Sequence, residues 1–120
     1  MTNCFDSFFG SGAIPFLERG LSFASERHRL ILDNIANADT PGYRRKDLDP
    51  GAFRRALAEA GGEAEPGWQG MLRRDGNNVD LERELALLAR NAIYHGEMAA
   101  LLRKSFEQIR MAAAERPTVA

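Results

Sequence analysis

The chain has 120 residues, of which 16 are basic and 17 acidic, giving a formal net charge of −1 at pH 7. This length suits one small domain or two long helices joined by a loop, and it excludes two separate enzymatic lobes. The balanced charge lacks the cationic excess that nucleic-acid binding needs, so nucleic acid is not an expected partner. A single cysteine, Cys4, rules out an intrachain disulfide and a multi-cysteine metal site.

Residues 1–14 are expected to form a flexible N-terminal segment rich in glycine, serine and phenylalanine. This segment lacks a basic stretch followed by an uninterrupted apolar run, so a cleaved secretory signal is not expected. No apolar run in the chain approaches the roughly 20 residues that span a bilayer. The sequence therefore predicts neither a signal peptide nor a membrane anchor.

A first amphipathic helix is predicted over residues 15–38, because Pro15 is well tolerated in a first helical turn and a regular apolar row follows it. The row alternates spacings of four and three residues, which is typical of coiled coils. Its members are Leu17, Leu21, Ala24, His28, Ile31, Ile35 and Ala38. The opposite, solvated face is expected to carry Glu18, Arg19, Glu26, Arg27 and Arg29. Gly20 is expected to be the weak point of this helix.

Residues 39–79 lose this periodicity and contain ten glycine and proline residues. Loops of this length usually serve a function or become ordered on binding. We therefore predict a turn followed by a long irregular loop that is ordered on assembly. One short helix is expected inside it, over about Pro50 to Ala60.

A second amphipathic helix is predicted over residues 80–114, followed by a short tail at 115–120. Asp80 can cap the first backbone N–H groups, and Glu82 and Glu84 oppose the positive end of the helix dipole. The apolar row alternates four and three residues for more than four heptads. It consists of Leu81, Leu85, Leu88, Ala92, His95, Ala99, Leu102, Phe106, Ile109 and Ala113.

These elements predict an all-α fold in which the two amphipathic helices form an antiparallel coiled-coil hairpin joined by a long irregular loop. Two helices cover only one face of each other, so the remaining apolar rows are expected to be covered by other chains. The expected assembly seam consists of Leu17, Leu21, Ile31, Ile35, Leu85, Leu88, Leu102, Phe106 and Ile109.

The most specific string is DNIANADTPGY at residues 33–43, where a helix runs into a turn. Pro41 keeps Thr40 out of helical geometry, and Gly42 can take the positive φ that the third position of a type II turn requires. Three polar residues can hydrogen-bond to nearby backbone where the helix ends: Asn34, Asn37 and Asp39.

This string resembles the N-terminal signature of the flagellar axial proteins, the family of rod, hook and hook-associated proteins. The matching residues are Asn34, Asn37, Asp39, Thr40, Pro41, Gly42 and Tyr43. The string GNNVDLERE at residues 76–84 resembles the C-terminal signature of the same family. Its matching residues are Asn77, Asn78, Val79, Asp80 and Leu81. With their helices the two strings cover about two thirds of the chain, leaving residues 1–14 and 49–72 without support from the resemblance.

The resemblance implies a structural subunit of the proximal rod, because the segment between the two strings is short, and the second string looks more like the B-type than the C-type subunit. It implies export through the flagellar type III apparatus without a cleaved signal, and polymerisation through the terminal helices into a shaft that crosses the periplasm. The implied partners are other rod subunits, the adaptor between rod and membrane ring, the export apparatus and further copies of the chain. Another rod or hook subunit and a cytoplasmic helical-hairpin adaptor remain alternatives.

No motif for a nucleophile, a phosphate-binding loop or a metal site is present, so no catalytic residue, cofactor, metal or small-molecule substrate is expected. His28 and His95 lie in the apolar rows. If Ala38 faced Leu81, His28 would lie opposite Asn91 and about four residues from His95, which favours a structural role.

Two further features leave alternatives open. The basic run Arg44, Arg45 and Lys46 is expected to be a solvated edge rather than a contact with another subunit, since acidic residues follow it. Trp68 stands alone in a glycine-rich stretch. It is either an anchor for a partner's pocket or a local cap on the loop.

Overall fold

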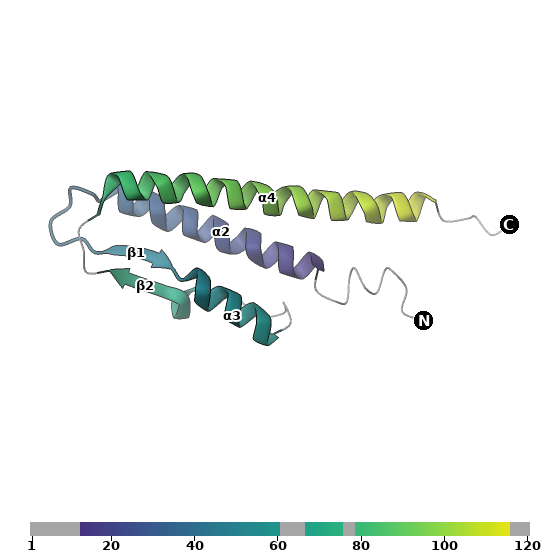
Figure 1. Ribbon diagram of the computed structural model, residues 1–120, viewed down its shortest axis with the longest axis horizontal. Coiled ribbons are helices and arrows are strands. Elements are labelled where there is room, and N and C mark those ends of the chain that lie inside the picture. Colours follow the sequence, from purple (N-terminus) through teal and green to yellow (C-terminus); the bar gives the residue numbers. More distant parts are fainter. Residues whose placement is uncertain (1–12, 61–66, 76–78, 116–120) are drawn as a thin grey trace.

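The computed structural model describes residues 13–60, 67–75 and 79–115 (Figure 1). Its elements in chain order are α2 (Ala13–Ala36), β1 (Arg45–Leu48), α3 (Pro50–Ala60), the 3-10 helix η1 (Trp68–Met71), β2 (Leu72–Asp75) and α4 (Leu81–Ala114). The described chain is mostly helical. The two long helices, α2 and α4, run side by side in opposite directions, and in the view of Figure 1 the two strands and α3 lie below α2.

The ends of the long helices follow from local chemistry. The Asp80 carboxylate accepts hydrogen bonds from the backbone N–H groups of Glu82 and Arg83, at 3.1 and 3.4 Å, which confirms the predicted cap of α4. The helix expected over residues 15–38 is observed as Ala13–Ala36, so it begins and ends two residues earlier. It ends earlier because the turn before Pro41 already starts at residue 37.

Contacts between α2 and α4 fix their register. The Asn91 side-chain amide donates to the Ala24 carbonyl at 2.7 Å. Asn91 therefore lies opposite Ala24 and not opposite His28, so the expected register is wrong by four residues, about one helical turn.

Gly20 lies where α2 and α4 approach each other closely, and is not simply a weak point of the helix. A Cβ atom at this position would come within 3.1 Å of the Tyr94 hydroxyl oxygen and of the Met98 sulfur. Glycine costs the helix about 1 kcal/mol relative to alanine. In return, the two side chains of α4 can lie directly against the backbone of α2.

The apolar row predicted on α4 does not form the face that packs on α2. The two buried residues of α4 are Glu84 and Asn91, and Leu88, Leu102 and Ile109 are only half-buried. Three large members of the row are exposed: Leu81 at 48%, Leu85 at 55% and Phe106 at 48%. On α2, by contrast, Leu17, Ala24 and Ile31 are buried, while Leu21, His28 and Ile35 are half-buried; Ala38, also half-buried, lies in the turn after the helix.

The segment between the long helices is not an irregular loop, and the fold is not purely helical. Strands β1 and β2 pair in an antiparallel sheet, with Arg45 opposite Asp75 and Leu48 opposite Leu72. The short helix predicted over about residues 50–60 is confirmed as α3. The strands escaped prediction because each has only four residues and is dominated by charged side chains, without an alternating apolar pattern.

An apolar cluster lies between α2 and the segment that contains β1 and α3. Phe23 and Leu30 of α2 pack with Leu48, Phe53 and Leu57, and α2 is therefore covered on two faces. The Phe23 and Phe53 rings stack with centroids 4.1 Å apart, and Trp68 meets Phe23 edge-on at 5.6 Å. Of the two roles considered for Trp68, the structure therefore favours the local cap.

Candidate functional site

The turn after α2 has the geometry that its sequence requires. The Tyr43 N–H donates to the Thr40 carbonyl at 3.2 Å, and Gly42 has φ of 75°. These two observations confirm the predicted turn with positive φ at its third position. A Cβ at Gly42 would meet no atom within 4 Å, so only the backbone conformation selects glycine there.

Of the three polar residues predicted to hydrogen-bond to nearby backbone, Asn37 does so at the end of α2. The Asn37 amide donates to the Asp33 carbonyl at 2.8 Å and accepts from the Thr40 hydroxyl at 3.2 Å. The backbone N–H of Asn37 donates to the same Asp33 carbonyl at 3.0 Å, so the Asn37 amide adds a second donor to the last backbone bond of the helix end. Asp39 and Pro41 are exposed.

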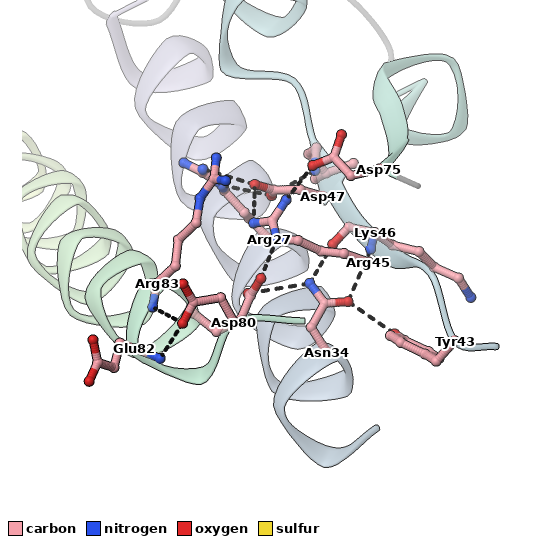
Figure 2. Close-up of polar contacts among 12 residues, drawn as sticks. Arg27, Asn34, Tyr43, Arg45, Lys46, Asp47, Asp75, Asp80, Glu82 and Arg83 are labelled. Atoms are coloured by element: carbon pink, nitrogen blue, oxygen red, sulfur yellow. Dashed lines mark hydrogen bonds and ion pairs between the residues drawn. The ribbon is translucent and has the colours of Figure 1, made fainter. Parts of the chain in front are cut away.

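Asn34 acts over a longer range than the sequence indicated. Its fully buried amide donates to the Lys46 carbonyl at 2.7 Å, and its oxygen accepts from the Lys46 N–H at 3.0 Å. The same oxygen accepts from the Tyr43 hydroxyl at 3.0 Å (Figure 2). Asn34 therefore joins α2 to the edge of β1 that does not face β2, and closes that edge to further strand pairing.

A network of charged residues lies beside Asn34 (Figure 2). The Arg45 guanidinium donates to Glu84 of α4, and also to Asp47 and Asp75, each at 3.1 Å. Arg27 of α2 donates to both carboxylate oxygens of Asp47, at 2.9 and 3.1 Å. We call these five residues, together with Asn34, the polar junction; it connects α2, β1, β2 and α4.

The centre of the polar junction is buried, whereas the side chains of Arg27 and Asp75 at its margin are 18% and 37% exposed. The side chains of Glu84, Asp47 and Arg45 are 0%, 2% and 5% exposed, respectively. Removing charges from water carries a large penalty, which these hydrogen bonds must offset. No buried side-chain nitrogen or oxygen atom within the described part of the chain lacks a hydrogen-bond partner.

The pKa values of Asp47 and Arg45 are shifted in the direction that favours their charged forms. Burial alone would raise the pKa of Asp47, but the hydrogen bonds and charges of Arg27 and Arg45 outweigh it and hold that pKa below its ordinary value. Burial would likewise lower the pKa of Arg45, yet Glu84 and Asp47 raise it. The arrangement therefore suits a permanent structural connection and not a group that exchanges protons in a reaction.

Sequence reasoning missed most of this junction. Arg45 was expected on a solvated edge and Arg27 on the solvated face of its helix, whereas Arg45 is buried and Arg27 is half-buried. Within the basic run, only Arg44 is exposed as a solvated edge would be, and Lys46 is half-buried. Glu84 was expected to act only on the helix dipole. No pattern in the sequence pairs residues that lie 39 and 20 positions apart, as Arg45 with Glu84 and Arg27 with Asp47 do.

The remaining candidate residues are not brought together into a site. His28 and His95 are both half-buried, and the described residues contain no cluster of three or more His, Cys, Asp or Glu side chains that could hold a metal. Val79 is half-buried, whereas Cys4, Asn77 and Asn78 lie outside the described residues. None of the described helices is both long enough and apolar enough to cross a membrane.

Both family strings contribute to the polar junction, since Asn34 comes from the first and Glu84 from the second. The junction therefore joins the two long helices at the strings that resemble those of structural axial proteins. No family model matches the chain. It is 34% identical to the flagellar basal body rod protein FlgB of Aquifex aeolicus over 96 residues, covering 67% of this chain and 75% of the relative.

Two further relatives carry the same name. The Salmonella typhimurium protein is 30% identical over 107 residues, covering 68% of this chain and 78% of the relative. The Bacillus subtilis protein is 26% identical over 121 residues, covering 83% of this chain and 92% of the relative. The chain belongs to the FlgB family of flagellar basal body rod proteins.

Proposed function

We propose that the chain is a structural subunit of the proximal rod and polymerises through α2 and α4 into the axial shaft that serves motility. Membership of the FlgB family supports the B-type rod position over the C-type position. We propose no catalytic activity and no cofactor.

The observation that carries polymerisation is the uncovered apolar row of α4. Leu81, Leu85 and Phe106 are each about half exposed, although they belong to a heptad row typical of helices that pack against other helices. Large apolar side chains that repeat along one row of a helix and stay exposed are available for packing against another chain. In an assembled rod, helices of neighbouring subunits would cover the row, and α2 with α4 would act as a coiled-coil hairpin in the inner layer.

The polar junction has a specific place in this proposal. It fixes the direction in which the chain leaves α2 and holds the β1–β2 pair against both long helices. A subunit that stacks by one repeated contact needs a constant shape, because small angular errors accumulate along an open helical assembly. We therefore assign the junction the role of keeping the hairpin and the sheet at a fixed angle.

The proposed partners and location follow from the family. We propose that the chain contacts other rod subunits, further copies of itself, the adaptor between rod and membrane ring, and the type III export apparatus. We place it in the periplasmic part of the basal body, reached without cleavage of a signal peptide.

The test compares two aspartate substitutions on α4 in cells that lack the wild-type protein. Leu85→Asp changes a half-exposed member of the heptad row, and Ala100→Asp changes an exposed position outside the row. We expect Leu85→Asp to remove the protein from purified basal bodies and to abolish swimming, while Ala100→Asp retains both. Normal incorporation of the Leu85→Asp protein would show that the row is not an assembly surface.

A further inference from the structure

A groove lies where α2, α3 and α4 meet, and it adjoins the polar junction at Arg27. Its volume is about 310 Å³, which suits a few side chains rather than a large ligand. Its apolar lining includes Phe23 of α2, Phe53 of α3 and Tyr94 of α4. The two phenylalanines are buried and Tyr94 is half-buried, so the floor of the groove is rigid and aromatic.

Three arginines also line the groove, one from each helix: Arg27, Arg54 and Arg90. Arg27 already holds Asp47 with two hydrogen bonds. Arg54 and Arg90 are exposed, and neither forms an ion pair with a carboxylate within the described part of the chain. The groove thus presents two uncompensated positive charges at the rim of an apolar floor.

We propose that this groove receives the first turn of α4 from a second copy of the chain. That turn presents Leu81 and Leu85, which are 48% and 55% exposed and lie one helical turn apart on the same face. Glu82 beside them is exposed, and its side chain points away from the polar junction (Figure 2). The two leucines match the aromatic floor, and the Glu82 carboxylate matches Arg54 and Arg90.

This inference rests on the proposed function, because it gives one contact by which copies of a rod subunit would stack. The donor turn and the groove occupy different parts of the same chain, so the contact is heterologous and repeats from copy to copy. It also accounts for why the first two leucines of the α4 row remain uncovered within one chain.

The test is a charge swap in cells that produce only the variant chain, with the amount of chain in purified basal bodies as the measurement. The single reversal Glu82→Arg and the double reversal Arg54→Glu with Arg90→Glu should each reduce incorporation at least tenfold. The triple variant, which carries all three changes, should recover most of it because the charges are again opposite. Arg103→Glu, an exposed reversal on α4 outside the groove, serves as the matched control and should have no effect.

Thermal unfolding of each purified variant, followed by circular dichroism, shows whether the monomer still folds. If folded reversal variants incorporate normally while Leu85→Asp does not, the groove contact is wrong but the proposed rod function stands. If the single and the double reversal both reduce incorporation but the triple variant does not recover it, the groove contact is likewise overturned. Incorporation of Leu85→Asp together with all reversals would contradict the proposed function itself.

Discussion

The side chain of Asn34 binds the backbone of Lys46 as a neighbouring strand would, donating to its carbonyl at 2.7 Å and accepting from its N–H at 3.0 Å. One helical residue thus satisfies both outward-facing backbone groups of Lys46 in the two-stranded sheet. Because Asn34 also lies 3.4 Å from Glu84, this single amide contacts β1 and α4 as well as its own helix.

Replacing Asn34 should therefore destabilise the whole fold. Asn34→Ala leaves the Lys46 N–H and carbonyl without their partner, and an unsatisfied buried polar group costs about 1–3 kcal/mol. We expect the free energy of unfolding, measured by urea denaturation, to fall by at least that amount. Asn37→Ala removes only local bonds at the helix end and should cost about 1 kcal/mol. Equal losses for the two variants would contradict the role assigned to Asn34.

At position 42, the size of a substituted side chain should matter little, whereas its tolerance of a positive φ should decide the effect on stability. An added side chain meets open space, yet φ of 75° is unfavourable for β-branched residues. Gly42→Val should cost more than 1 kcal/mol, whereas Gly42→Asn should cost less, because asparagine enters this region more readily. Thermal melts of the two variants provide the measurement, and similar melting temperatures would show that the turn relaxes to another type.

Removing one partner of the Arg45–Glu84 contact should lower the free energy of unfolding more than removing both partners. Arg45→Met leaves the Glu84 carboxylate buried without its main partner, and such losses are typically about 3–5 kcal/mol. Adding Glu84→Leu to the same chain should recover part of that loss, since no unpaired charge remains at that contact. The exposed pair Arg29 and Glu26 provides the control, because Arg29→Ala should change stability by less than about 1 kcal/mol. Additive effects of Arg45→Met and Glu84→Leu would contradict a coupled pair.

Asp47 should give the protein an acid-sensitive component of stability. Its pKa is lower in the folded than in the unfolded state, so its contribution is fully present above the ordinary aspartate pKa of about 3.9. That contribution is lost as the pH falls from there through the lower, folded-state pKa. Asp47→Asn should therefore be less stable than the wild-type chain at neutral pH, and the difference should shrink in this acidic range. Urea denaturation at a series of pH values measures the difference in free energy of unfolding between the two chains. A difference that does not change with pH would exclude Asp47 as the source of the acid sensitivity.

Local chemistry allowed much of the helical framework to be predicted. The cap at Asp80, the turn at Gly42 and the short helix α3 depend on residues within a few positions of one another, and all three are confirmed. The heptad row of α4 was recognised as apolar, but its orientation was not. A helix with several apolar and polar faces can rotate, and the burial of Glu84 and Asn91 decided which face meets α2.

The sequence by itself determined the two long helices, the turn between them and, through the two signature strings, the rod-protein family. Only the tertiary structure decided that Arg27, Arg45, Asp47 and Glu84 are buried together, and that two short charged strands form at all. The physical reason is that a charged side chain normally favours water. It becomes a core residue only when partners from distant parts of the chain supply enough hydrogen bonds and opposite charge to offset its dehydration.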